Sequence, residues 1–319
     1  MPYQPAVVTT TAAGINHMPA AHYKKRGLDK LKKKFRFLSI TEPDDIPRRA
    51  GKTAQWFRYA LLAADLTPSS EGVVGNSESL SNITLTATVE EYSNFITTST
   101  LARETFIDDP ILESVDALSY QAGITVDSLA RNEFDANTAA NVATLAGAAS
   151  GADIRRVVTV LESNDVQPRD GDEFMAILHP FILYDLRSDN TAGGFLETLK
   201  YANPSMLLEN GERGKIGGCR LIVSTNVTTS GTAPNLLYNT YIAGRGGVGH
   251  VALAGSGPSK VVDPSKESFA INVIPGKPQL ADPEGKIGGA VSYRFVQTMV
   301  TLDTATLRFR ILQADASLV

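Results

Sequence analysis

Residues 83–90 read Ile-Thr-Leu-Thr-Ala-Thr-Val-Glu, and in this run apolar and polar side chains alternate without a fault. A period of two is that of a strand with one buried face. Residues 52–59, Lys-Thr-Ala-Gln-Trp-Phe-Arg-Tyr, are aromatic and β-prone, although their alternation is weaker. The two runs predict the outgoing and returning strands of a long hairpin.

The connection between these strands is unusually polar. Thr67 to Ser81 holds five serines, two glycines, one proline and almost nothing to bury. Structureless connections longer than about 12–15 residues are uncommon in compact domains, and a two-stranded hairpin is marginal alone. We therefore predict that residues 51–98 form an arm that lies on another surface, for which a neighbouring subunit is the favoured candidate.

Length and composition describe an ordinary water-soluble chain. With 319 residues, 43% of them hydrophobic and 20% charged, the chain can bury a sizeable core in one large domain or two. No apolar run approaches the ~18–20 residues that span a bilayer, and the first thirteen residues do not resemble a secretory signal. The single cysteine, Cys219, excludes an internal disulfide and favours a reducing cytoplasm.

Charge is distributed unevenly along the chain. Residues 1–50 carry ten Lys/Arg against four Asp/Glu, which is +6, so with a total of −4 the remainder carries −10. A basic segment on an acidic body suggests nucleic acid or an acidic surface of a sister subunit as partner, while a solvated helix face remains the alternative. The basic candidates are Lys24, Lys25, Arg26, Lys32, Lys33, Lys34 and Arg36.

The clearest helix begins after the hairpin. Asp109 is placed as its N-cap and Pro110 as its first residue. One apolar stripe follows at helical spacing, comprising Ile111, Val115, Leu118, Ala122, Val126 and Leu129. The helix can run to about Phe134, a length of about 39 Å at 1.5 Å per residue. A long helix with one stripe is expected to act as a spine on which other elements pack.

The remaining elements mix helices and strands without strict alternation, which favours the α+β class. Residues 136–149 are expected to separate the spine from the next helix. Helices are predicted over 151–164, 180–188 and 195–201, and strands over 174–178, 219–224, 236–243, 251–254, 291–295 and 307–311.

Two glycine motifs imitate nucleotide sites. Gly244 to Gly249 satisfies GxGxxG, but a second strand follows where the dinucleotide fingerprint needs a helix, so we interpret it as a hairpin turn. Gly51-Lys52-Thr53 resembles the end of a phosphate-binding loop, but Ile46 occupies the position of the required first glycine.

No catalytic, cofactor or metal site is predicted, and the chain is not expected to be an enzyme. Cys219 opens an apolar strand, where a small buried hydrophobe is usual. His179 is expected to close a strand or cap the following helix. The four histidines show no metal-ligand spacing. Paired carboxylates at 44–45, 90–91 and 108–109 fall in a turn, on a strand edge and at a helix cap. This pattern favours a structural protein.

An ordered set of short motifs resembles a known family. The motifs are Gly51-Lys52-Thr53, Glu71-Gly72, Asp109-Pro110-Ile111-Leu112, Gln121-Ala122-Gly123, Asp127-Ser128-Leu129-Ala130-Arg131, His179-Pro180, Tyr184-Asp185-Leu186-Arg187, Lys200-Tyr201-Ala202 and Gly214-Lys215-Ile216-Gly217-Gly218-Cys219-Arg220. Together they resemble the phage major capsid protein family named after coliphage N-four, which has the Hong Kong 97-type capsid fold. Arg213 and Cys219 depart from more apolar family positions.

The resemblance implies a domain plan and a function. It implies an N-terminal arm over 1–46, an extended loop over 47–98, a peripheral domain over 99–166 with 268–319, and an axial domain over 167–267. Such proteins assemble as hexamers and pentamers into an icosahedral shell around double-stranded DNA. The implied location is the virion capsid, assembled in the host bacterial cytoplasm. The implied partners are sister subunits, non-specifically packaged DNA and a portal protein, with a cement protein left open and no membrane.

Within this hypothesis, Trp56, Arg58, Glu71 and Glu78 of the arm are the candidate intersubunit contacts, and the basic residues between Lys24 and Arg36 are candidates to face the lumen. Three alternatives remain. They are an encapsulin-like nanocompartment shell, a dinucleotide-dependent enzyme using Gly244–Gly249, and a DNA-binding protein acting through Lys24–Arg36.

Overall fold

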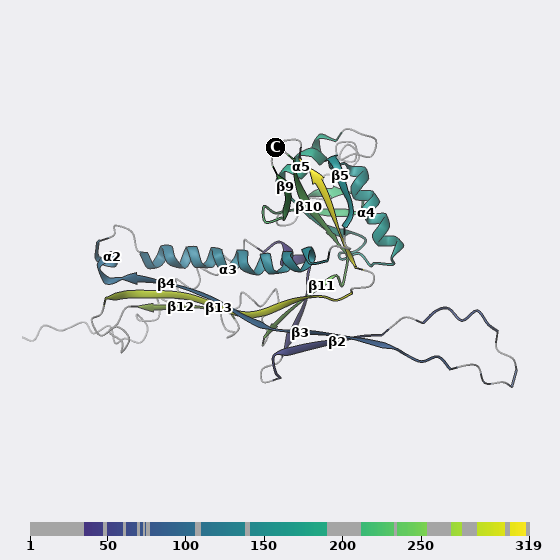
Figure 1. Ribbon diagram of the computed structural model, residues 1–319, viewed down its shortest axis with the longest axis horizontal. Coiled ribbons are helices and arrows are strands. Elements are labelled where there is room, and N and C mark those ends of the chain that lie inside the picture. The colour runs from purple at the N-terminus through teal and green to yellow at the C-terminus, as the bar shows by residue number, and fades with distance from the viewer. Residues whose placement is uncertain are drawn as a thin grey trace, which may run out of the picture.

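The computed structural model describes most of the chain, with gaps. The described residues are 35–46, 50–59, 62–68, 71–72, 74, 77–105, 110–137, 141–189, 212–232, 235–253, 269–275, 286–303 and 307–316. They form two sheets joined by a long helix, and a two-stranded hairpin extends away from both sheets (Figure 1). The α+β class is confirmed.

The first sheet has five strands. They are β1 (Glu42–Ile46), β4 (Glu90–Ser99), β11 (Val248–Leu253), β12 (Phe269–Pro275) and β13 (Ile287–Thr301). The 15-residue strand β13 pairs with β4 along one edge and with β12 and then β11 along the other. Strand β1 adds to β11 in parallel. Helix α3 (Pro110–Asp135) covers one face of this sheet, and the short helix α2 (Thr100–Thr105) follows β4 (Figure 1).

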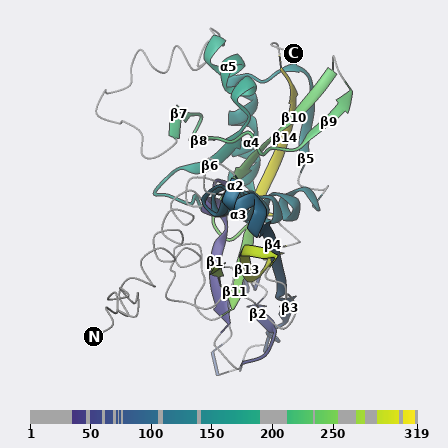
Figure 2. The same cartoon turned by 90° about the vertical axis from the view of Figure 1, so that its left-hand side faces the viewer.

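The second sheet has seven strands and forms the upper lobe of Figure 2. They are β5 (Asn141–Ala148), β6 (Phe174–Leu178), β7 (Glu212–Ile216), β8 (Cys219–Val223), β9 (Thr229–Thr232), β10 (Asn235–Ala243) and β14 (Phe309–Asp315). The order is β5-β14-β10-β6-β8-β7, with β9 also paired to β10. Helices α4 (Gly151–Ser163) and α5 (Pro180–Ser188) bury apolar residues in the same core.

The local signals that start these helices are visible in the side chains. Ser150 caps α4 through a capping box, since Ser150 and Asp153 each accept a hydrogen bond from the other's backbone N–H. His179 caps α5, its Nδ1 accepting from the backbone N–H of Phe181 at 3.3 Å, and Pro180 takes the first helical position. The capping role expected of His179 is confirmed.

Helix α3 belongs to both hydrophobic cores. Its first four turns, with Val115 and Ala122, pack on the five-stranded sheet through Val291, Tyr293 and Phe295 of β13. Its last turns place Ala130 and Phe134 in the core of the seven-stranded lobe. The predicted spine is confirmed over Pro110–Asp135, whereas the proposed cap Asp109 lies outside the described residues.

The segment before the arm also reaches both lobes. A short 3-10 helix, η1 (Phe37–Ile40), buries Phe37 and Ile40 in the seven-stranded core and Leu38 in the other. The carboxylate of Asp127 on α3 accepts hydrogen bonds at 2.7 Å from the backbone N–H groups of Arg36 and Phe37. The chain then enters β1, so residues 36–46 bind the two lobes together.

Several sequence predictions need correction. The sequence predicts a separator over residues 136–149, but β5 forms there because its backbone pairs in parallel with β14. Gly244–Gly249 is not a hairpin turn, because β10 and β11 lie in different sheets and the glycines carry the chain between them. The predicted helix over 195–201 lies outside the described residues.

Sheet membership also divides the chain differently from the domain ranges that the resemblance implied. Strand β11 falls within the range 167–267 but lies in the sheet that α3 covers. Conversely, β5, α4 and β14 fall within 99–166 and 268–319 but build the seven-stranded lobe.

Candidate functional site

The hairpin arm is the most unusual feature of the described structure. Strands β2 (Thr53–Tyr59) and β3 (Asn82–Thr88) pair only with each other, from Thr53 opposite Thr88 to Tyr59 opposite Asn82. The predicted pair of strands is confirmed, but the arm is shorter than the predicted range 51–98, because residues 90–98 lie in β4 and pair with β13 of the five-stranded sheet. Beyond them the described residues continue away from both lobes (Figure 1), so a large part of the arm is unsupported by the described residues of the two lobes.

One face of the arm is anchored to the body. Ala54 and Trp56 pack against a small cluster of Ile46, Val89 and Val251. The backbone N–H of Val89 donates to the carbonyl of Lys52 at 2.9 Å and closes the base of the hairpin. Arg58, on the same face, forms an ion pair with Asp303. The anchoring therefore extends along β2 as far as Arg58.

The opposite face carries exposed aromatic rings. Phe57 and Tyr59 alternate with the anchored residues and are 59% and 57% exposed. Of the twelve large hydrophobic residues exposed in the described part of the chain, seven lie between 57 and 83. They are Phe57, Tyr59, Leu62, Leu66, Val74, Leu80 and Ile83. A concentration of exposed apolar side chains in one segment is typical of an interaction surface.

The four predicted contact residues separate into two groups. Trp56 and Arg58 lie on the anchored face and contact their own chain. Glu71 and Glu78 are exposed at the tip. Sequence reasoning missed Phe57 and Tyr59, although the alternation of β2 carried the signal, since the neighbours of a half-buried, inward-facing Trp56 must point the other way.

The predicted basic segment is mostly outside the described residues. This applies to Lys24, Lys25, Arg26, Lys32, Lys33 and Lys34. Arg36 is described, and its backbone N–H is held by Asp127 at the C-terminal half of α3. The basic segment therefore joins the body beside the spine helix.

A second surface lies on the five-stranded sheet, on the face that α3 does not cover. Phe95 of β4 pairs with Ser292, and Ile274 of β12 pairs with Ala290, so both large side chains share this face. Both are exposed, Phe95 at 66%. The sheet thus presents apolar side chains to solvent on one side while its other side is buried under the helix.

The nucleotide-like motifs lack the surroundings they would need. The backbone after Gly244–Gly249 enters β11 rather than a helix, so no helix N-terminus is present there to receive a pyrophosphate. Gly246 has φ +74°, and Gly244 lies so close to Val166 and Gln167 that a Cβ would clash. These glycines permit a tight crossing between the sheets. Lys52 likewise leads into β2 rather than a helix.

The only cysteine is structural in its surroundings. Cys219 is fully buried in the seven-stranded core, and burial raises the pKa of its thiol to about 12. A thiol with so high a pKa is a poor nucleophile at neutral pH. Burial lowers the pKa of His179, whose Nδ1 is used in capping α5.

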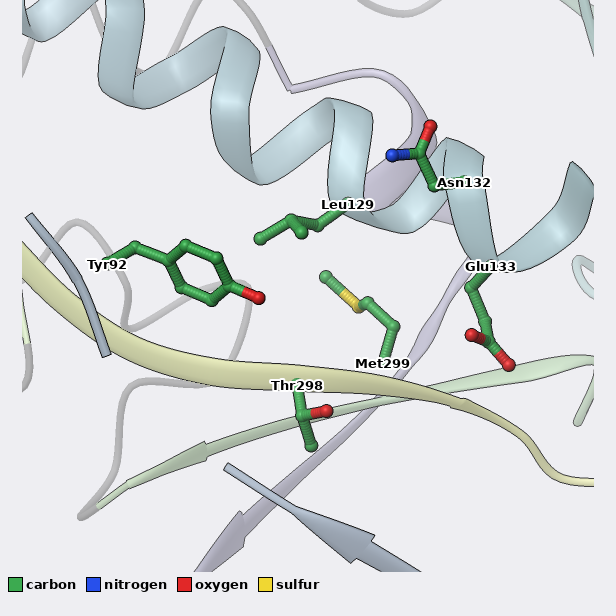
Figure 3. Close-up of a pocket in the computed structure, with 6 residues that line it drawn as sticks. All are labelled: Tyr92, Leu129, Asn132, Glu133, Thr298 and Met299. Atoms are coloured by element: carbon green, nitrogen blue, oxygen red, sulfur yellow. The ribbon is translucent and has the colours of Figure 1, made fainter. Parts of the chain in front are cut away.

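A small open hollow lies between α3 and β13, with a volume of about 220 Å³ (Figure 3). It is lined by Tyr92, Leu129, Asn132, Glu133, Thr298 and Met299. Glu133 accepts hydrogen bonds at 2.8 Å from the backbone and hydroxyl of Thr301, and Tyr92 donates to Glu90. These groups already serve contacts within the chain. Within the described residues no cluster of metal-ligating side chains occurs.

No helix in the described part of the chain combines the length and the apolar character needed to cross a bilayer.

Comparison with known proteins identifies the fold. The chain matches no family model and no curated protein sequence. Among solved structures it is similar to the capsid of Ralstonia phage GP4, with a TM-score of 0.67, 15% identity, and coverage of 89% of this chain and 92% of that one. The capsid of cyanophage Pam1 gives a TM-score of 0.61 at 14% identity, covering 90% and 92%. An encapsulin complex from Synechococcus elongatus gives 0.57 at 11% identity, covering 88% and 87%. The predicted architecture is confirmed: the chain has the Hong Kong 97-type capsid fold.

Proposed function

We propose that this chain is the major capsid protein of a tailed double-stranded DNA bacteriophage. The observation that carries the proposal is the arm, a two-stranded hairpin on a capsid fold with seven exposed large hydrophobic residues that no described part of its own chain covers. Burial of such side chains is favourable by roughly 1.5–3 kcal/mol each. Assembly into a shell would bury these side chains, because the arm of every copy would lie on a neighbouring subunit.

The receiving surface in this proposal is the exposed face of the five-stranded sheet on a neighbouring subunit. Its Phe95 and Ile274 offer apolar contact to the Phe57 and Tyr59 rings of an arriving arm. Trp56 and Arg58 would support the arm from its own body, and Glu71 and Glu78 would make polar contacts at the tip. Hexamers and pentamers built by this exchange would close into an icosahedral shell.

We assign the lobes by sheet membership. The five-stranded sheet with α3, including β11, would be the peripheral domain, and the seven-stranded lobe with β5, α4 and β14 would be the axial domain at the centre of each capsomer. The basic residues from Lys24 to Arg36 would face the lumen and bind packaged DNA through non-specific phosphate contacts. A portal protein and a cement protein complete the expected partners, in a capsid assembled in the host cytoplasm. A structural rather than catalytic role follows.

The test is electron microscopy of the chain expressed alone, with and without residues Pro68–Ser79. We expect closed particles from the intact chain. The shortened chain should fold, with an unchanged circular dichroism spectrum, but form no closed shells. Normal particles from the shortened chain would refute the role of the arm. A matched control replaces the same twelve residues with a Gly/Ser sequence of equal length, which separates loss of contacts from loss of reach.

An encapsulin-like nanocompartment is the second candidate, favoured by the similarity to the encapsulin structure. Nuclease treatment of particles isolated from the natural host separates the two proposals. Genome-length DNA protected inside the particles supports the capsid, whereas a cargo enzyme in place of DNA supports the nanocompartment.

A further inference from the structure

Three parts of the molecule meet at one buried carboxylate. Asp303 lies two residues beyond the end of β13 of the five-stranded sheet and is only 2% exposed. Arg58 reaches it from the arm, and the Nε of Arg308, which precedes β14 of the seven-stranded lobe, lies 3.3 Å from its Oδ2. The Asp303 carboxylate thus pairs with two guanidinium groups, one from the arm and one from the seven-stranded lobe.

The two arginines are more exposed than the carboxylate that they share, at 35% for Arg58 and 39% for Arg308. Guanidinium–carboxylate hydrogen bonds are directional. Salt screens an ion pair with a buried carboxylate less than it screens a fully exposed pair. The geometry therefore constrains the direction from which Arg58 approaches, and with it the direction of β2.

The same junction holds the chain where it passes between the sheets. The Oε1 atom of Glu42, at the start of β1, accepts hydrogen bonds from Arg169 at 2.9 Å and from the backbone N–H of Gly246 at 3.1 Å. Arg169 also donates to the carbonyl of Thr41 at 2.8 Å. Gly246 lies against the side chain of Arg308. The arm is therefore linked through Asp303 and Arg308 to the residues that join the two lobes.

Arg58 also stands where support for the arm ends. Its cross-strand partner, Ile83, is already 51% exposed. Trp56, the preceding residue on the anchored face of β2, lies two residues closer to the base of the hairpin. Arg58 is thus the outermost described residue of β2 that holds the arm to the body, and a small change of angle there moves the tip by a large distance.

We propose that Asp303 is a positioning residue for assembly, which sets the angle of the arm relative to both lobes through Arg58 and Arg308. This inference rests on the proposed function in that it assigns the arm to a neighbouring subunit. The chemistry calls for a cation at position 58, because a neutral side chain leaves β2 held, within the described residues, by the apolar contacts of Ala54 and Trp56 and by the hydrogen bond at the base of the hairpin.

The direct test measures the angle of the arm before assembly. Cysteines introduced at Leu66 in the arm and at Glu113 on the exposed face of α3 carry spin labels, while the buried Cys219 stays unlabelled. Labelled chain is diluted with unlabelled chain, and distances are recorded by double electron–electron resonance. We expect one narrow distribution for the parent, a broad one for Arg58→Gln, and a largely restored one for Arg58→Lys.

The matched control is Arg294→Gln, which removes an exposed arginine–glutamate pair between β13 and β4. It should leave the distance distribution unchanged. A distribution for Arg58→Gln as narrow as that of the parent would overturn the proposal, as would equal broadening by Arg294→Gln. Arg58 is chosen over Asp303 because removal of a buried carboxylate between two arginines risks misfolding.

The second readout is the uniformity of assembled particles by electron microscopy. Arg58→Gln should lose the single particle diameter of the parent, while its thermal unfolding midpoint falls only modestly, because Arg308 still pairs with the buried Asp303. Uniform particles would contradict a positioning role in assembly. If the parent forms no particles, the proposed function fails, but the spin-label distances still decide whether Arg58 and Asp303 position the arm.

Discussion

The body and the arm are both built from β-strands, but they differ in how far the apolar faces of these strands are buried. Each lobe closes a core, and the seven-stranded lobe buries Phe134, Phe174, Tyr241 and Phe309 almost completely. The arm has two strands, one anchored face and an exposed face with Phe57 and Tyr59. The body therefore has what it needs to fold as a single chain, whereas the described residues contact only one face of the arm. We infer that different parts of the sequence determine folding and assembly: the two lobes determine the fold, and the arm provides contacts for assembly.

The largest effect on stability is expected where α3 joins the two lobes. Phe134 is fully buried, with ring centroids of Phe309, Tyr241 and Phe37 at 4.7, 6.1 and 6.4 Å. Phe134→Ala should lower the free energy of unfolding by about 3–5 kcal/mol, because the cavity opens in the core of the seven-stranded lobe where α3 enters it. Urea denaturation measures this change. Tyr120→Ala, on the exposed side of the same helix, should change it by less than about 0.5 kcal/mol. Equal effects would show that α3 does not join the lobes as described.

A smaller effect is expected at the buried carboxylate that holds the N-terminal segment. Asp127→Ala leaves the backbone N–H groups of Arg36 and Phe37 without their acceptor, which should cost about 1–3 kcal/mol. Asp127→Asn keeps one oxygen for these two donors and should cost less. Equal losses from the two variants would contradict the hydrogen-bonding role.

Asp127 also gives a signed pH dependence. Burial, although opposed by hydrogen bonds from Arg36, Asn226 and Phe37, raises the carboxyl pKa above 3.8. The folded state then binds the proton more tightly than the unfolded state, so this group's contribution to stability falls as pH rises from 3.8 through the folded pKa. Denaturation curves from pH 4 to 7 should show this component in the parent and not in Asp127→Asn. An identical pH profile in both proteins would argue against it.

Periodicity was sufficient for the elements that are regular by themselves. The stripe of α3 and the alternation of β3 are local properties of the sequence, and both elements occur as predicted. Strand β1, Glu-Pro-Asp-Asp-Ile, has no strand signal, and it forms because β11 offers a free edge in parallel register. Strand β5 is rich in small residues and depends in the same way on β14. β1 and β5 form because each pairs with a strand that is distant in sequence, so local sequence patterns could not predict them.

The candidate site was predictable in part, for a similar reason. Its location in the arm followed from the long polar tip between two β-prone runs. The identity of the contacting face required knowing which side of β2 lies on the body, and the cluster at Asp303 requires residues 58, 303 and 308 to meet. Contact between residues so far apart in the chain is a property of the fold, and it produces no recognisable spacing pattern in the sequence.

The smallest stability effect, and the sharpest contrast, is expected between neighbours on β2. Trp56→Ala should cost about 1 kcal/mol, since its half-buried ring anchors the arm. Phe57→Ala should change the free energy of unfolding by less than about 0.5 kcal/mol, because the ring is 59% exposed. Yet Phe57→Ala should reduce the yield of closed particles more than Trp56→Ala does, because only the outer face is available to a second subunit. Denaturation and particle counts on the same preparations test both halves. Normal particles from Phe57→Ala would place the intersubunit contact elsewhere on the arm, and an unchanged stability of Trp56→Ala would mean that the Trp56 ring does not anchor the arm.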